Sequence, residues 1–278
     1  MRVTRMLTAV LVAMLTVGGA GAGLAQTPES TLEVVKKRGT LVAGVKADYP
    51  PFGYTDKDGQ LVGFDIEIVN YMAKKLGVKV DLRPVTSANR IPMLANGTID
   101  VLAASFTITT EREKVVDFTI PYFLSGGSFL VKKGSGIKGY PSLAGKTVTF
   151  TQGTPWEKKV LQEQPKAKGL VFQDKPQAVL AVKQGKADAY VDDDIPLYLF
   201  AKEHPELEVV SGATAKHPMG IAVRENDSKW RDFINFTLIE MWEDCSYQQI
   251  YRHTFGRNPD PRFEMPDWRV VSQRKKCD

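Results

Sequence analysis

Strand-like and helix-like segments alternate along this chain, and this alternation constrains the fold more than any other feature. A continuously apolar run over 41–45 is typical of a strand buried on both faces. After a polar turn, apolar residues recur at four-residue spacing and predict an amphipathic helix that ends at Gly77: Phe64, Ile68, Met72 and Leu76. Strands over 78–82 and 99–103, with a short helix over 88–95 between them, continue the series. The pattern predicts a mainly parallel sheet flanked by helices.

A second series of the same kind begins after Gly145. Strand-like segments over 147–151, 170–172 and 187–191 alternate with helix-like segments over 155–164 and 176–184. Two short apolar segments next to glycines, 126–131 and 219–223, flank this series and are interpreted as two crossings between lobes.

We therefore expect an α/β protein with two lobes. Residues 26–131 and 219–278, which include a helical stretch over 229–255, form a discontinuous lobe 1, and residues 132–218 form an inserted lobe 2. A single continuous domain is the alternative, and a length of 278 residues disfavours it only moderately.

Residues 1–25 have the pattern of a secretory signal peptide. Arg2 and Arg5 precede an apolar run that is too short to span a bilayer, and small residues precede a cleavage position after Ala25. A membrane anchor is the weaker interpretation. We expect a soluble mature protein in the periplasm, where oxidising conditions and an even cysteine count favour a disulfide between Cys245 and Cys277 over two free thiols.

Composition and motifs disfavour several classes of protein. The 37 Lys and Arg residues are interspersed with 32 Asp and Glu residues, and the basic run at 274–276 is short, so we expect no nucleic-acid partner. The three histidines, at positions 204, 217 and 253, lack the spacing of metal ligands, and no nucleophile elbow or phosphate-binding glycine loop is present. We therefore expect no enzyme, no catalytic residue, no metal and no cofactor.

The segment 104–112 is the most informative for a binding site. It leaves a buried strand at the end where open α/β sheets bind ligands, and it enters an expected helix through hydroxyl residues. There Arg112 and free backbone N–H groups would clamp a carboxylate, unless Arg112 is an exposed helix residue paired with Glu111 or Asp117. Lys46, Arg90 and one acid of the run 192–194 are further candidates, each otherwise a solvated surface charge.

Residues 38–255 resemble the extracytoplasmic solute-binding proteins of polar amino-acid ABC importers. The segments that carry the resemblance occur in order: GVKADYPPF at 44–52, VGFDIE at 62–67, Asn96-Gly97 before Asp100, SFTITTER at 105–112 and DFTIPY at 117–122. The resemblance implies a type II periplasmic-binding-protein fold, with an amino acid held in the cleft between lobes by hinge closure. It further implies a monomer that delivers its ligand to permease subunits in the inner membrane.

The resemblance also implies roles for residues of the cleft. Arg112 matches the clamp of the ligand's α-carboxylate, assisted by Thr107 and the backbone at Ser105, and Asp193 matches the acceptor of the α-ammonium. Tyr49 lies in the first matching segment and is expected at the ligand.

In lobe 2, Thr151 and Thr154 match positions that line the cleft. Pro155 and Trp156 depart from the commoner pattern of small hydroxyl or amide residues. A capping box of Thr154, Pro155 and Glu157 would explain these residues by helix initiation alone.

The resemblance suggests a ligand through Lys46, Ser87 and Arg90, which match the acidic and amide binders rather than the basic ones. Two cations that converge on a buried pocket favour a carboxylate, so glutamate or aspartate is our first expectation. Glutamine, or a broad range of polar amino acids, is the second. An exported enzyme resembling cyclohexadienyl dehydratase is an alternative of another class, for which we see no general acid. A receptor's sensing domain would require a spanning helix.

Overall fold

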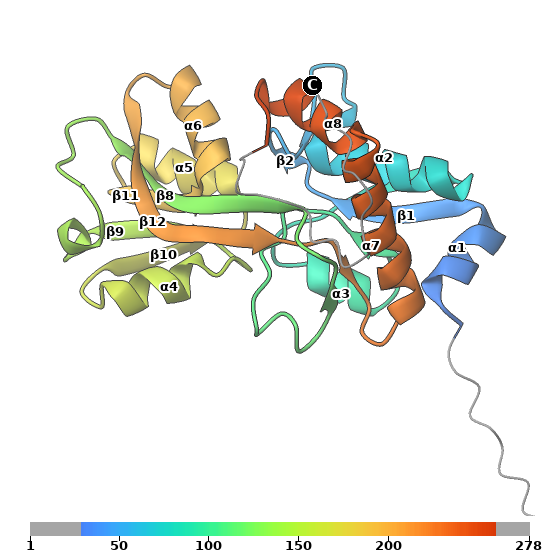
Figure 1. Cartoon of the computed structure of the whole chain (residues 1–278). Coiled ribbons are helices and arrows are strands. Elements are labelled where there is room, and N and C mark those ends of the chain that lie inside the picture. Colours follow the sequence, from blue (N-terminus) through green and yellow to red (C-terminus); the bar gives the residue numbers. More distant parts are fainter. Residues whose placement is uncertain (1–28, 260–278) are drawn as a thin grey trace, which may run out of the picture.

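Two five-stranded sheets, each accompanied by helices, form the two lobes of the chain (Figure 1). The computed structural model describes residues 29–259. The expected signal peptide at 1–25, the basic run and Cys277 lie outside the described residues, so the signal peptide and the disulfide stay predictions. Within 29–259, no helix has the length and apolar character needed to cross a membrane.

The sheet of the first lobe has the strand order β5-β1-β6-β13-β7. Strand β1 pairs in parallel with β5 and β6, and β13 runs antiparallel to β6 and β7. Four of the five strands therefore run in one direction, which confirms the mainly parallel sheet. The strands are β1 (Thr40–Val45), β5 (Lys79–Pro84), β6 (Val101–Leu102), β7 (Asp117–Phe118) and β13 (Ala222–Val223).

The helices of this lobe follow the sequence pattern closely. In α2 (Phe64–Leu76), Phe64, Ile68 and Met72 are fully buried, and the helix ends at Gly77 in the left-handed conformation. The expected stretch 229–255 is two helices, because Cys245 adopts a left-handed φ of 69° between them. The other elements are α1 (Thr31–Arg38), α3 (Arg90–Ala95), α7 (Ser228–Glu243), α8 (Ser246–Phe255) and a small sheet of β2 (Asp48–Tyr49), β3 (Gly53–Thr55) and β4 (Leu61–Val62).

The second lobe repeats this architecture with the strand order β10-β9-β11-β8-β12. Strand β9 pairs in parallel with β10 and β11, and β8 runs antiparallel to β11 and β12, so four of five strands again share one direction. Its elements are β8 (Phe123–Lys132), β9 (Thr147–Thr151), β10 (Lys168–Phe172), β11 (Ala189–Asp193), β12 (Leu207–Met219), α4 (Trp156–Glu163), α5 (Lys175–Lys183), α6 (Asp194–Glu203) and the 3-10 helix η1 (Tyr140–Leu143).

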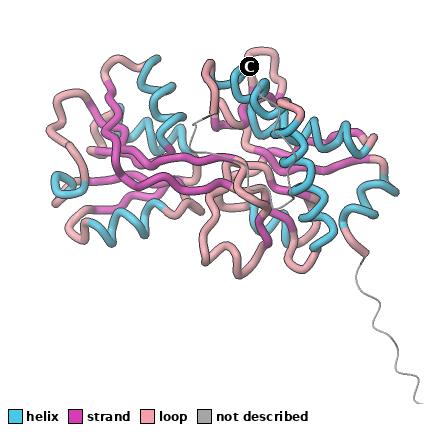
Figure 2. Tube along the Cα trace, in the orientation of Figure 1, coloured by secondary structure: helices cyan, strands magenta, loops and turns pink. Residues whose placement is uncertain are grey.

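Strands β8 and β12 are the two connections between the lobes, and Figure 2 shows them running side by side. Near the first lobe, Phe123 pairs with Met219 and Ser125 with His217. Farther along, Gly127–Val131 pairs with β11 inside the second sheet, although our expected limits counted residues 126–131 with lobe 1. The limits of the lobes remain a prediction, and this register moves the crossing toward residue 125.

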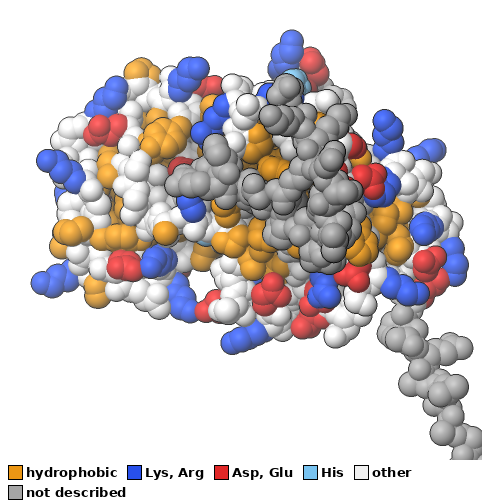
Figure 3. Space-filling view, viewed as in Figure 1, with side chains coloured by type: hydrophobic (Ala, Val, Ile, Leu, Met, Phe, Trp, Pro, Cys, Tyr) orange, Lys and Arg blue, Asp and Glu red, His pale blue; other side chains and the backbone are white. Residues whose placement is uncertain are grey.

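One expected element is absent. The residues after Thr107 form turns instead of the predicted helix, with the amide of Arg112 donating to Thr109 O and that of Val116 to Arg112 O. Strand β7 begins at Asp117, so only a short segment separates Thr107 from the next strand. On the described part of the face in Figure 3, cationic and anionic side chains are interspersed.

Candidate functional site

A cavity lined by both lobes brings together all ten residues that the sequence predicted. The residues come from the carboxyl ends of strands β1, β5, β6, β9 and β11 and from the segments that follow them. They are Lys46, Tyr49, Ser87, Arg90, Ser105, Thr107 and Arg112 from the first lobe, and Thr151, Thr154 and Asp193 from the second.

Two buried guanidinium groups dominate the wall of the first lobe. The Cζ atoms of Arg90 and Arg112 lie 4.2 and 4.3 Å from the ring centre of Phe106. Arg112 donates to Thr107 O at 2.6 Å and, across the cleft, to Gly153 O at 3.0 Å. Since Arg112 is only 8% exposed and Glu111 and Asp117 pair with Lys158 and Arg231 instead, the alternative of a surface residue is wrong.

Neither guanidinium has a carboxylate partner among the described residues. Arg90 donates from one Nη to Ala104 O at 2.9 Å, while its buried Nε has no hydrogen-bond partner in that part of the chain. Burial lowers the pKa of Arg90 to about 10, and burial together with the charge of Arg90 lowers the pKa of Arg112 to about 8. An anion bound between them would relieve both effects.

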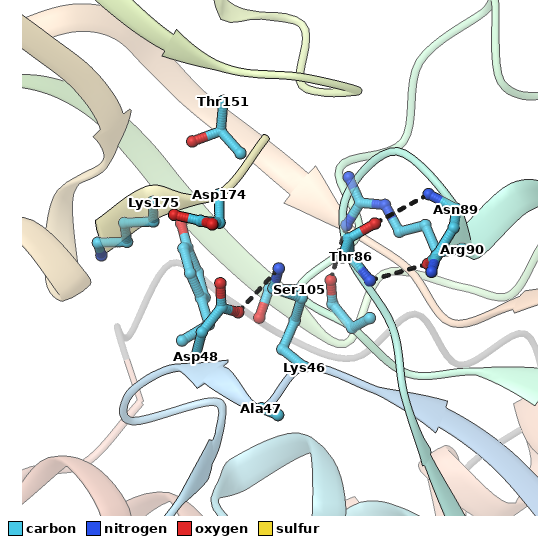
Figure 4. A network of polar contacts seen from close by, with 12 residues as sticks. Lys46, Ala47, Asp48, Thr86, Asn89, Arg90, Ser105, Thr151, Asp174 and Lys175 are labelled. Atoms are coloured by element: carbon cyan, nitrogen blue, oxygen red, sulfur yellow. Dashed lines mark hydrogen bonds and ion pairs between the residues drawn. The ribbon is translucent and has the colours of Figure 1, made fainter. Parts of the chain in front are cut away.

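Two lysines of the cavity, one from each lobe, do have anionic partners. Lys46 Nζ lies 2.9 Å from Asp48 Oδ1, an ion pair visible in Figure 4. Lys175 Nζ lies 3.7 Å from Asp192 Oδ2 and 4.6 Å from the ring centre of Tyr49. The expectation that Lys46 needs a carboxylate of the ligand as its counterion is therefore wrong, because Asp48 already supplies one.

The acids of the run 192–194 separate into different environments. Asp192 and Asp193 are buried and line the cavity, whereas Asp194 begins α6 and contacts Lys216. The hydroxyl of Tyr49 reaches across the cleft to Asp192 Oδ1 at 2.7 Å and Asp193 Oδ2 at 2.8 Å. Burial, opposed by Lys175, raises the pKa of Asp192.

Asp193 has a second neighbour on its other oxygen. His217 Nε2, on the crossing strand β12, lies 2.9 Å from Asp193 Oδ1. Asp193 is therefore held from both sides of the cleft at the position where the resemblance implies an α-ammonium acceptor.

Two expectations about backbone and hydroxyl donors are corrected. The amide of Ser105 donates to the buried carboxylate of Asp65 at 2.7 Å, so this amide cannot assist a carboxylate clamp. The hydroxyl of Thr154 donates to Thr151 O at 2.7 Å, and α4 has no side-chain cap, so the capping box is wrong. Both hydroxyl residues nevertheless line the cavity.

The two lobes are in close contact at Gly153. This residue has a φ of +81°, and a Cβ atom built on it would lie 2.3 Å from Ser87 O of the other lobe. Only glycine satisfies both conditions without a shift of the backbone.

Further residues line the cavity that the site prediction did not include: Ala104, Pro155, Trp156, Lys175, Tyr190 and Asp192. Lys175 is the most consequential of them. It follows the helix-capping Asp174 at the start of α5, a position where a lysine is normally exposed to solvent. Nothing in the sequence therefore distinguishes Lys175 from a surface lysine. Within residues 29–259, no group of three or more His, Cys, Asp or Glu is arranged to hold a metal ion.

Comparisons with known proteins agree with this architecture. The model of the bacterial extracellular solute-binding proteins, family 3, matches residues 41–257. The ABC transporter glutamine-binding protein GlnH of Bacillus subtilis is 36% identical over 247 residues, covering 87% of this chain and 90% of GlnH. The glutamate/aspartate import solute-binding protein of Salmonella typhimurium is 32% identical over 293 residues and covers 96% of this chain and 95% of its own length.

A solved structure is similar over most of the chain. An ancestral amino acid-binding protein, described as a precursor of cyclohexadienyl dehydratase, superimposes with a TM-score of 0.76 at 38% identity and covers 81% of this chain and all of its own. The relatives thus include binders of different polar amino acids.

Proposed function

The chain belongs to the bacterial extracellular solute-binding proteins of family 3 and is a binding protein of amino-acid ABC importers, and we propose that its ligand is an acidic amino acid, glutamate or aspartate. The observation that carries the proposal is the pair of buried guanidinium groups, Arg90 and Arg112, without carboxylate partners in the described chain. We further propose export through residues 1–25 to the periplasm and delivery to membrane permease subunits.

The α-amino-acid group has complementary partners on both walls. Arg112 and the hydroxyl of Thr107 face the cavity from the first lobe and would bind the α-carboxylate, for which a guanidinium offers two parallel donors. Asp193 faces it from the second lobe and would accept the α-ammonium. A ligand held in this way connects the lobes and favours their closure around it.

The charge balance of the cavity favours an acidic side chain. Among the side chains that line the cavity, counted with Asp48 as the partner of Lys46, four are cations and three are acids: Lys46, Arg90, Arg112 and Lys175 against Asp48, Asp192 and Asp193. The lining therefore carries one positive charge in excess. An acidic amino acid carries a net charge of −1 and compensates it, whereas glutamine leaves the excess and arginine increases it. Arg90 is the cation that remains for the side-chain carboxylate after Arg112 binds the α-carboxylate.

The test is calorimetric titration of the mature protein and of the variant Arg90→Gln with L-glutamate, L-aspartate and L-glutamine. Glutamine at position 90 keeps hydrogen-bonding groups and removes the charge. We expect the acidic ligands to lose about 2–5 kcal/mol of binding free energy, which is more than tenfold in affinity, and L-glutamine to lose much less. Arg83→Gln is the control, because Arg83 is an exposed cation that pairs with Asp81.

Tighter binding of L-glutamine by the wild type, or equal losses of all three ligands in Arg90→Gln, would show that the acidic assignment is wrong. Glutamine is the second candidate, since the similar protein of Bacillus subtilis is named for glutamine. A sample that consumed a prephenate-like substrate would instead support the dehydratase alternative. Reversible binding with recovery of unchanged ligand supports transport.

A further inference from the structure

Asp65 is a fully buried carboxylate behind the cavity wall that the binding scheme does not use. It lies in the first turn of α2, where the helix dipole favours a negative charge. Its Oδ2 accepts hydrogen bonds from the amide and the hydroxyl of Ser105 at 2.7 and 3.1 Å, and its Oδ1 accepts one from the hydroxyl of Tyr122 at 2.7 Å. Burial raises its pKa to about 6 against these donors, so the group is ionised at pH 8.

Ser105, which Asp65 contacts twice, has an unusual backbone conformation. Its φ of 46° lies in the left-handed region, which residues other than glycine adopt only when their surroundings hold them there. Ser105 is 7% exposed and lines the cavity, so a change in its conformation would change the wall that the ligand meets. The two hydrogen bonds that Asp65 accepts from Ser105 therefore stabilise the unusual backbone conformation of that serine.

The same two bonds determine what Ser105 can offer a ligand. A serine has one amide proton and one hydroxyl proton, and both point to Asp65, so its hydroxyl retains only lone pairs for the cavity. Lone pairs accept hydrogen bonds from an ammonium group and repel a carboxylate.

We propose that Asp65 is a positioning residue that makes Ser105 an acceptor for the ligand's α-ammonium. It holds the left-handed turn at Ser105 and engages both of its donors, so this part of the wall selects the ammonium end of an amino acid. The inference rests on the proposed function, because it requires an α-amino acid in this cavity. It does not depend on the side chain of that amino acid.

The experiment compares L-glutamate with glutarate, which has both carboxylates and no ammonium, by calorimetry at pH 8. In Asp65→Asn we expect the affinity for L-glutamate to fall by roughly tenfold or more, and that for glutarate by less than roughly threefold. Tyr122→Phe is the matched control, since it removes one hydrogen bond from Asp65 and leaves both bonds to Ser105. Its ratio of the two affinities should equal that of the wild type.

Ser105→Gly provides a second variant in case Asp65→Asn does not fold. Glycine adopts a positive φ without support but lacks the hydroxyl, so the preference for L-glutamate over glutarate should also shrink. Equal losses of both ligands in Asp65→Asn, or an unchanged preference in Ser105→Gly, would overturn the proposal. If the wild type prefers L-glutamine, the same series is run with L-glutamine and its deamino analogue glutaramate. A wild type that binds no amino acid contradicts the proposed function before any variant is compared.

Discussion

Replacing Gly153 by alanine tests whether contact between the lobes is needed for tight binding. The new Cβ would lie 2.3 Å from Ser87 O, where ordinary contacts are 3.4–4 Å, so the lobes must separate locally by roughly 1 Å. That separation lengthens the hydrogen bond from Arg112 to Gly153 O, now 3.0 Å. A hydrogen bond to a charged group contributes about 1.5–3 kcal/mol, so we expect affinity to fall roughly tenfold to a hundredfold.

The φ of Gly153, +81°, adds a cost that is the same in the free and bound protein. Alanine in the left-handed region loses about 1–2 kcal/mol of folding stability. Gly145→Ala isolates this cost, because Gly145 has a φ of +74° and no atom within 4 Å of a built Cβ.

Both variants should therefore unfold at lower temperature, by a few degrees, and only Gly153→Ala should bind weakly. Thermal denaturation and calorimetry with L-glutamate measure the two effects. If Gly153→Ala binds within about threefold of Gly145→Ala, the approach of the lobes at this point contributes nothing to affinity and the reasoning fails.

The remaining predictions concern the clamp, the pH response, the disulfide and the motion. Arg112→Ala should lose binding of every α-amino acid by about 2–5 kcal/mol, and near-native affinity in calorimetry would contradict the clamp. Burial lowers the pKa of His217, but its hydrogen bond with Asp193 and the charge of Asp193 outweigh burial and raise it above its ordinary value. The stability that His217 contributes should thus be present below about pH 6.5 and be lost as pH rises through its raised pKa, and denaturant melts of His217→Gln should lack this step. An ammonium on Asp193 opposes the protonated imidazole, so ligand affinity should decrease as pH falls through that pKa, and titrations in buffers of different ionisation enthalpy should detect proton release. Mass spectrometry of an unreduced digest should find Cys245 joined to Cys277, a bond that contributes roughly 3–4 kcal/mol, and two freely alkylated thiols would refute it. Small-angle scattering should show a smaller radius of gyration with saturating L-glutamate, and an unchanged curve would exclude hinge closure.

Strand order predicts the positions of some site residues, and the family resemblance supplied the others, such as Thr107 and Thr151. Parallel strands bring their carboxyl ends to one edge of a sheet, so Lys46 after β1 and Ser105 after β6 meet there. Asp193 ends β11 in the second sheet, and it lines the same cavity because the two lobes face each other across it. Periodic burial likewise identified α2 and its end at Gly77. The strand ends and the helix periodicity are both visible in short stretches of sequence, and the fold then brings the strand ends together in space.

The pairing of charges was not predictable in the same way. Asp48 neutralises Lys46, and Lys175 enters the cavity from the start of α5, through side-chain contacts that no spacing encodes. The helix expected at Arg112 does not form, because the backbone N–H groups of this segment make hydrogen bonds within turns instead. Tertiary contacts decided each of these cases, so a count of site charges from sequence alone was incomplete.

The hydroxyl of Tyr49 carries one proton and faces two carboxylates. The proton can lie between Tyr49 and only one of the two carboxylates, Asp192 at 2.7 Å or Asp193 at 2.8 Å. The contact of Tyr49 with the other carboxylate then has no proton, unless a carboxyl group is itself protonated. An ammonium ligand brings three donors, and one of them on Asp193 lets the tyrosine serve Asp192. In the closure that we propose, an empty cavity therefore leaves one of the two contacts of Tyr49 without a proton, whereas an amine in the cavity supplies one. This contact would make the relative position of the two lobes depend on whether an amine is bound.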